Sequence, residues 1–189
     1  MKRLNCIDYA RRLSDILLST DWDNVEKLAN KLHALGNNNS TLFLCGNGGS
    51  AGNAEHLAND FLYGISPNDA NGLKVEALSA NCSVLTCLGN DLGYEQIFSR
   101  QLEVKASAGD MLIVLSGSGN SKNILQAIEV AKRKNVFTVG ILGFDGGMAK
   151  SMVDFVVHFN INDMQLSEDL QLITGHMIMK MMRESLGKA

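Results

Sequence analysis

The chain has 189 residues, 46% of them hydrophobic and 20% charged, and a formal net charge of −3. These values exclude a disordered or fibrous protein and predict one soluble domain that is large enough to bury a core. A generic nucleic-acid binder would carry an excess of basic residues, and this chain carries none. We therefore predict no nucleic-acid partner.

Four cysteines, at positions 6, 45, 82 and 87, form no Cys-x-x-Cys pair. Cys45 and Cys87 have apolar neighbours, so we expect both in the core. Their spacing does not indicate a disulfide framework, which favours a reducing compartment. Charges interrupt the apolar positions of the first 18 residues, unlike a signal peptide or a membrane span. The sequence therefore predicts a cytoplasmic protein without a membrane partner.

Two helices are predicted before any strand. Apolar residues recur near a helical period over residues 3–18, and a second helical pattern runs from Asp23 to Leu35, ahead of Gly36 and a polar tract. A minimal open sheet does not require two leading helices. We therefore expect the segment 1–38 to pack on the domain or on another subunit.

Beyond this segment, short apolar runs alternate with helical patterns. The predicted strands are 41–45, 73–78, 111–115, 137–142 and 154–159. Helices are predicted from Ser50 through Phe61, over 122–134 and over 163–186, and the methionines of the last one favour a core or a subunit interface. The alternation predicts a layered α/β fold with a parallel sheet and right-handed crossovers, in one domain spanning 1–189.

Two glycine-rich loops follow strands of this sheet, CGNGGSAG at 45–52 and LSGSGNS at 115–121. Loops at the carboxyl ends of parallel strands line the ligand crevice, and a helix that starts after a glycine turn offers free N–H groups to an anion. Neither loop contains lysine or arginine. The loops instead carry serine hydroxyls, at Ser50, Ser116, Ser118 and Ser121. This combination predicts a bound phosphate monoester.

Two alternatives to a phosphate monoester site remain open for these loops. Gly46, Gly48 and Ala51 satisfy the dinucleotide pattern G-x-G-x-x-[G/A], but the acidic residue that should bind a ribose, Glu76, lies inside its strand instead of at the end. A dinucleotide site would also leave the second loop without a role, and the GxxxxGK[ST] motif of nucleotide triphosphate sites is absent. We therefore expect no nucleotide cofactor. The second alternative is that the glycines only make turns.

Four ordered blocks carry a family resemblance: GNGGSAGNAEHLANDF, LGNDLGYEQIFSRQ, GDMLIVLSGSGNSKN and the terminal helix. The chain resembles the SIS domain of bacterial phosphoheptose isomerases over nearly its whole length. The resemblance implies a flavodoxin-like sheet of five parallel strands flanked by helices, and a homotetramer with active sites at subunit interfaces. The implied reaction converts sedoheptulose 7-phosphate into D-glycero-D-manno-heptose 7-phosphate.

The resemblance also implies roles for individual residues. Substrate contacts correspond to these positions: Asn47, Gly48, Gly49, Ser50, Asn90, Asp91, Ser116, Gly117, Ser118, Ser121 and Glu168. Gly117 replaces a family threonine, Asp60 a catalytic glutamate and Glu168 a glutamine, while His176 matches the catalytic histidine. Gly117 and Asp60 are together expected to enlarge the pocket.

Aldose–ketose isomerisation requires a base for the proton beside the carbonyl and an acid for the developing enediolate oxygen. Asp60 is the candidate base and His176 the candidate acid. Asp is shorter than Glu by about 1.5 Å, which raises the question of whether Asp60 reaches the substrate.

The resemblance further implies a divalent metal, and His56, Asp60, Glu168 and His176 form a chemically suitable zinc set. On one continuous helix Glu168 and His176 would lie about 12 Å apart along the axis. A metal could join them only if Glu168 lies at or before the helix start.

Two further functions stay open beside the isomerase. SIS domains also occur as non-catalytic binding modules, including a replication-initiator-associating protein, and the departures at positions 60, 117 and 168 favour that possibility. An isomerase or epimerase of another phosphosugar is the other possibility, because Gly117 and Asp60 together would enlarge the pocket.

Overall fold

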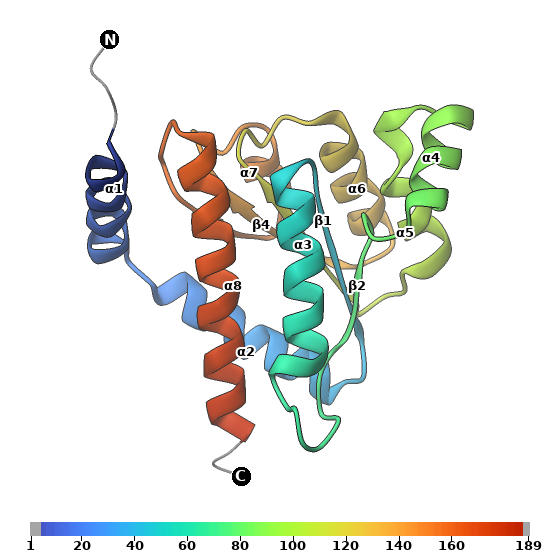
Figure 1. The fold of residues 1–189 in the computed structure, drawn as a ribbon. Coiled ribbons are helices and arrows are strands. Elements are labelled where there is room, and N and C mark those ends of the chain that lie inside the picture. Colours follow the sequence, from blue (N-terminus) through green and yellow to red (C-terminus); the bar gives the residue numbers. More distant parts are fainter. Residues whose placement is uncertain (1–4, 187–189) are drawn as a thin grey trace.

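The computed structural model describes residues 5–186. Five parallel strands form one sheet in the order β2-β1-β3-β4-β5 (Figure 1). The strands are β1 (Thr41–Gly46), β2 (Lys74–Ala77), β3 (Met111–Ser116), β4 (Phe137–Leu142) and β5 (Phe155–His158). All five predicted strands and the parallel α/β class are confirmed. The order reverses between β1 and β3, and in such sheets the ligand crevice lies at the carboxyl ends of the strands at this point.

The predicted helices are present, and further ones follow the second strand. The predicted ones are α1 (Cys6–Ser19), α2 (Asp23–Asn37), α3 (Gly49–Asn59), α6 (Lys122–Arg133) and α8 (Met164–Leu186). Residues 3 and 4 of the first predicted helix lie outside the described range. A π-helical turn, η1 (Asp60–Gly64), continues α3. The helical segments not predicted are α4 (Cys82–Asp91), the 3₁₀ turn η2 (Tyr94–Gln96), α5 (Ser99–Lys105) and α7 (Ala149–Met152).

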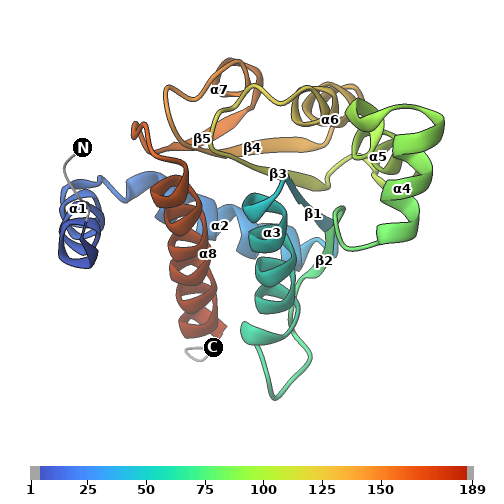
Figure 2. The same cartoon turned by 45° about the horizontal axis from the view of Figure 1, so that its top comes forward.

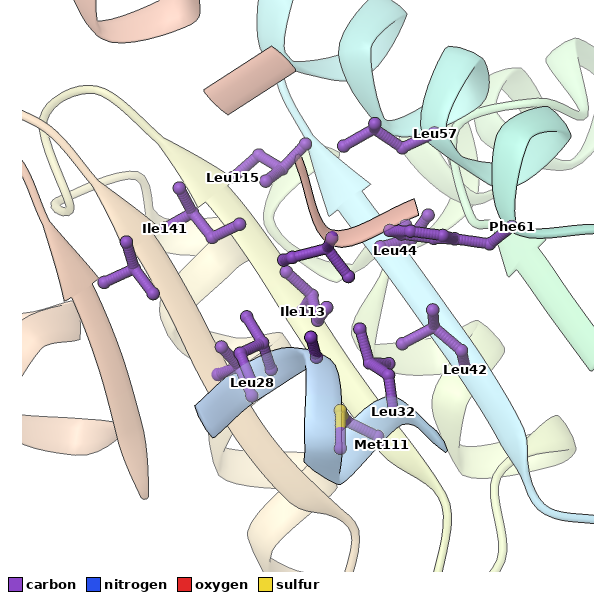
Figure 3. Packing of buried hydrophobic residues seen from close by; sticks show 14 of the residues in the cluster. Leu28, Leu32, Leu42, Leu44, Leu57, Phe61, Met111, Ile113, Leu115 and Ile141 are labelled. Atoms are coloured by element: carbon purple, nitrogen blue, oxygen red, sulfur yellow. The ribbon is translucent and has the colours of Figure 1, made fainter. Parts of the chain in front are cut away.

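Alternation along the central strands creates a separate core on each face of the sheet. Leu42 and Leu44 of β1 point into one core, whereas Phe43 and Cys45 point into the other. Figure 3 shows the first core, where leucines of α2 and α3 pack on β1 and β3. Both faces of the central strands are buried, which explains why they read as continuous apolar runs.

The helices divide between the two faces. The core that contains Leu42 and Leu44 is covered by α2, α3 and α8, while α5, α6 and α7 lie over the opposite core (Figure 2). Met182 of α8 is buried in the first core and Met181 packs against it, which confirms a core role for part of the methionine cluster. No helix within residues 5–186 is long and apolar enough to cross a membrane.

The first helix lies beside the sheet layers and packs only partly buried side chains against the first core. None of its residues, all within the described range, is buried. Its contacts with the start of α8 are polar: the Tyr9 hydroxyl donates to Asp169 at 2.6 Å, and Arg12 pairs with Asp163 at 2.9 Å. Partial burial and the bond to Asp169 raise the pKa of Tyr9 to about 12. Leu13, Ile16 and Leu17 pack against the first core, whereas Ile7 and Leu18 are exposed, so only part of the apolar surface of α1 is covered by its own chain.

The placement of the cysteines corrects one expectation. Cys45 is buried in β1, and burial raises its pKa. The prediction of a core position for Cys87 is wrong, because Cys87 is exposed on α4. Its apolar neighbours form part of a helix instead of a strand, so position 87 faces outward while Leu85 and Leu88 pack inward. A hydrogen bond to Asp91 raises the pKa of this thiol.

Candidate active site

The first loop joins β1 to α3 through glycines that cannot be replaced without movement. A Cβ on Gly46 would lie 2.5 Å from the backbone oxygen of Ser50, and Gly48 adopts a positive φ of 56°. A Cβ on Gly49 would overlap the Glu168 carboxylate of α8. Ser50 is buried at the start of α3. The turn therefore brings the α3 N-terminus to the carboxyl edge of the sheet, with Glu168 against it.

The second loop joins β3 to α6 and holds its shape by internal hydrogen bonds. The Gly119 N–H donates to Ser116 Oγ at 3.0 Å, and the Asn120 N–H donates to Ser118 Oγ at 3.3 Å. Ser121 is the N-cap residue of α6, and its hydroxyl makes no capping bond within the described chain. The three predicted hydroxyls of this loop are thus gathered at the N-terminus of α6, which is the arrangement that suits a phosphate.

Gly117 of this loop does not enlarge the pocket as expected. A Cβ at this position would lie 2.5 Å from Met164 Sδ and 3.5 Å from Phe144 Cε2. Met164 is the first residue of α8, and its side chain takes the space that a threonine at position 117 would need. The missing hydroxyl is therefore replaced by an apolar contact, which a motif comparison confined to the loop cannot show.

A network of amides connects the two loops. Asn47 Nδ2 donates to Asn123 Oδ1 at 2.9 Å, and Asn123 Nδ2 donates to Asn47 Oδ1 at 2.8 Å. The Tyr94 hydroxyl donates to the same Asn47 oxygen at 2.9 Å. A cavity of about 460 Å³ lies beside this network, and its lining residues are Asn47, Gly93, Tyr94, Glu95, Ser121, Lys122 and Asn123.

Five of these lining residues have no role among the sequence predictions: Gly93, Tyr94, Glu95, Lys122 and Asn123. All five lie within the segments GYEQ and GNSKN of the blocks that carry the resemblance. That location is the signal from which they could have been found. Lys122 also adds a cation beside the second loop, where it pairs with Glu95 at 3.6 Å.

The candidate catalytic residues meet between α3 and α8. His56 Nε2 and His176 Nε2 are 2.9 Å apart, and each lies 3.4 Å from Asp60 Oδ2. Asp60 opens the π-helical turn that follows α3, a feature often found at functional sites. Gly175 allows the two helices to approach, because a Cβ there would lie 2.7 Å from Leu57 Cδ1. Residues 120 positions apart are thereby brought within hydrogen-bond distance.

These three side chains also form a group that could hold a metal ion. Their ligand atoms all lie within 4.8 Å of one another. Tetrahedral zinc, with bonds of about 2.0–2.1 Å, would place its ligand atoms about 3.3 Å apart. The observed separations of 2.9 and 3.4 Å fit that requirement.

Glu168 does not join this group of ligand atoms. It lies inside α8, not at or before the helix start, and its carboxylate rests against Gly49. The condition for a shared metal, set by helix geometry, is therefore not met. The group of possible metal ligands therefore has three members instead of the predicted four. Glu168 contacts the first loop instead.

Asn90 and Asp91 are the last two residues of α4. Both are exposed, and Asn90 Nδ2 donates to Asp91 Oδ1 at 2.8 Å. Neither lines the cavity beside the amide network. Their predicted contact with substrate stays a prediction.

Glu76 is engaged elsewhere, since it pairs with Lys105 at the outer edge of the sheet. The ribose-binding carboxylate that a dinucleotide site requires is therefore not available in this position. Two glycine-rich loops at the carboxyl ends of neighbouring strands, with a histidine–carboxylate cluster on the helices α3 and α8, are the features expected of a sugar-phosphate-binding α/β domain.

Comparison with known proteins identifies the family. The model of the SIS domain family matches residues 6–143, so the chain belongs to the SIS domain family. The phosphoheptose isomerase of Aneurinibacillus thermoaerophilus is 36% identical over 162 residues, which cover 86% of this chain and 81% of that protein. That of Chlorobaculum parvum is 35% identical over 184 residues, covering 96% and 88%. The chain therefore belongs to the phosphoheptose isomerase family, as the resemblance implied.

A solved structure agrees with this assignment. Phosphoheptose isomerase GmhA from Neisseria gonorrhoeae superposes with a TM-score of 0.82 at 26% identity, covering 94% of this chain and 92% of that chain. The predicted flavodoxin-like fold, which places β1 next to β3, is thus found both in the strand order and in a solved relative.

Proposed function

We propose that the chain is an aldose–ketose isomerase that converts sedoheptulose 7-phosphate into D-glycero-D-manno-heptose 7-phosphate. The observation that carries this proposal is the cluster of His56, Asp60 and His176 on α3 and α8, in a member of the phosphoheptose isomerase family. The first glycine-rich loop leads into α3, and α8 places Glu168 against that loop. The second loop and the α6 N-terminus bind the phosphate. The first loop, with Ser50 and Glu168, holds the sugar chain.

Asp60 and His176 are the residues that carry out the proposed proton transfers. Asp60 removes a proton from the hydroxymethyl carbon beside the ketone, and His176 donates a proton to the ketone oxygen, which gives an enediol. Return of the proton to the former ketone carbon, with loss of the proton on the terminal hydroxyl, gives the aldehyde. Asp60 Oδ2 lies 3.4 Å from His176 Nε2, so the base and the acid can face one enediol.

Exchange of substrate hydrogen with solvent tests this function. The protein is incubated with sedoheptulose 7-phosphate in deuterium oxide, and deuterium is expected at the carbon beside the carbonyl. The variant His176→Ala should lose turnover while its circular dichroism spectrum is unchanged. A non-catalytic binding module would bind the sugar phosphate without exchange. Absence of exchange with every ketose phosphate tried would refute the enzymatic function.

We also propose that one zinc ion binds to His56, Asp60 and His176. Three protein ligands are the number that catalytic zinc sites use, and the separations of the ligand atoms suit a tetrahedral ion. A bound ion would supply Lewis-acid polarisation of the ketone oxygen in place of the His176 proton, because an Nε2 that coordinates zinc cannot donate, and the second oxygen of Asp60 would accept the substrate proton.

Zinc titration by calorimetry in the absence of substrate tests the ligand set. The variants His56→Ala and His176→Ala should each weaken zinc binding by roughly 100-fold or more, since each removes one of three ligands. Glu168→Gln should change the dissociation constant by no more than about threefold, because Glu168 lies outside the group. An equal loss in all three variants would return Glu168 to the ligand set.

We further propose that copies of the chain assemble as a homotetramer. Leu18 of α1 is 84% exposed, and Leu62 and Tyr63, which follow Asp60, are 58% and 61% exposed. Apolar residues in these places are suited to contacts between subunits that also close the active site. Light scattering should give a tetramer, and Leu18→Glu should shift it to smaller species. A monomeric wild-type protein would contradict this proposal.

We place the activity in the cytoplasm, because the four cysteines of the chain are free thiols, which suits a reducing compartment.

A further inference from the structure

Asn47 is surrounded by hydrogen-bond partners from its own chain. Its Oδ1 accepts from Asn123 Nδ2 at 2.8 Å and from the Tyr94 hydroxyl at 2.9 Å, while its Nδ2 donates to Asn123 at 2.9 Å. An amide oxygen has two lone pairs, so both are in use. One N–H is all that the side chain retains for a ligand. Asn47 is therefore held by the protein more than it is available to a substrate.

Asn123 is the partner that completes this arrangement. It is 2% exposed and is the second residue of α6. Its Oδ1 also accepts from the Ile124 N–H at 3.0 Å, which fixes the orientation of the amide plane. A buried amide with these partners is expensive to disrupt, because its polar atoms would lose their hydrogen bonds out of contact with water.

The hydrogen bonds between Asn47 and Asn123 connect the first loop to the N-terminus of α6, and both are proposed to bind one sugar phosphate. Asn47 lies between Gly46 and Gly48 in the first loop, and Asn123 lies two residues after Ser121 of the second loop. The reciprocal bonds therefore fix the distance between the first loop and the α6 N-terminus. Binding groups that are held in place before the ligand arrives lose less entropy when it binds.

We propose that Asn123 is a positioning residue, which acts through Asn47 to hold both loops at the spacing that a single sugar phosphate requires. Tyr94 secures the same Asn47 oxygen from the side of the cavity, and its side chain is exposed there. This inference rests on the proposed function, because it assumes that both loops bind one phosphosugar.

Phosphate affinity measured by calorimetry tests the inference, with inorganic phosphate and sedoheptulose 7-phosphate as probes. Asn123→Ala should weaken the binding of the sugar phosphate by roughly tenfold, and of inorganic phosphate less, because the sugar phosphate spans both loops while phosphate contacts one. In the steady state KM should rise by a similar factor. Asn47→Ala should have the same effect, and the double variant should be no weaker than either single variant.

Two further variants keep the test decisive. Tyr94→Phe removes one bond from an exposed side chain and should weaken sugar-phosphate binding by about threefold, even if Asn123→Ala does not fold. Asn24→Ala, on α2 and away from the loops, removes an asparagine bond to the backbone of Val156 and should leave the affinity unchanged. Each measurement is made well below the thermal midpoint of the variant.

The outcomes separate the inference from the function on which it rests. If the wild-type protein binds neither probe, the proposed function fails and the inference fails with it. If the wild type binds sugar phosphate and Asn123→Ala binds it within twofold as well, the inference alone is overturned. Strict additivity of Asn47→Ala and Asn123→Ala would also overturn it, because the two residues would then act separately.

Discussion

Asp60→Asn is expected to reduce kcat by about 10²–10⁴-fold, since it removes the proposed general base while it keeps the shape of the side chain. The Asp60 side chain is 15% exposed, and Oδ2 lies 3.4 Å from each of two imidazole nitrogens. An amide cannot accept the substrate proton at neutral pH. Steady-state kinetics with sedoheptulose 7-phosphate measure the loss, and Asp69→Asn, an exposed carboxylate in the loop before β2, is the matched control.

The variant Asp60→Glu tests whether the shorter reach of aspartate lowers kcat. The longer carboxylate extends by about 1.5 Å, toward the reach that the family glutamate provides. The cluster is partly open, since the side chains of His56 and His176 are 49% and 42% exposed, so the added methylene can be accommodated. We expect Asp60→Glu to keep at least about a tenth of the wild-type kcat. If Asp60→Asn keeps as much activity as Asp60→Glu, Asp60 is not the base.

The sheet could be predicted from the sequence because each strand is a local pattern. All five strands are short apolar runs bounded by glycines or polar residues, and each one forms with ends within one residue of the prediction. The segment between β2 and β3 was harder to predict. There α4 begins with an Asn81 cap that accepts from the Val84 N–H, but its residues are mostly exposed or half-buried and its apolar face is short.

The site was predictable to the extent that its residues act within one helix. His56 and Asp60 are four residues apart, so the sequence alone indicates that they share a helix face. Contacts between residues that are far apart in the chain could not be predicted from the sequence. Neither the thioether of Met164 over Gly117 nor the amide pair of Asn47 and Asn123 leaves a local pattern, because their members are 47 and 76 positions apart. These contacts depend on how α6 and α8 return to the same edge of the sheet.

A second large effect is expected in the loop that carries the serine hydroxyls. Gly119 adopts a φ of 65°, and a Cβ there would overlap the backbone carbonyl of Gly146 and lie 3.1 Å from the Gly147 nitrogen. The atoms that this Cβ would meet belong to the backbone of Gly146 and Gly147, not to a flexible side chain. Gly119→Ala must therefore move the loop after β3 away from the loop after β4. The left-handed conformation costs a non-glycine residue about 1–2 kcal/mol, and overpacking adds roughly 1–3 kcal/mol.

We therefore expect Gly119→Ala to lower the free energy of unfolding by about 2–5 kcal/mol, measured by urea denaturation at one fixed protein concentration. The Ala149 N–H donates to Gly119 O, so the shift would also move the β4–α7 loop and weaken phosphate binding.

The same substitution at Gly52 is the matched control. Gly52 lies inside α3, where a Cβ meets no heavy atom of the described residues within 4 Å. Alanine is favoured over glycine in a helix interior by about 0.5–1 kcal/mol, so Gly52→Ala should leave stability equal or slightly higher. Opposite signs for one chemical change would show that the loss at Gly119 comes from its conformation and its contact with Gly146. A loss below about 0.5 kcal/mol at Gly119 would mean that the two loops can separate freely, and a rigid phosphate site would then be untenable.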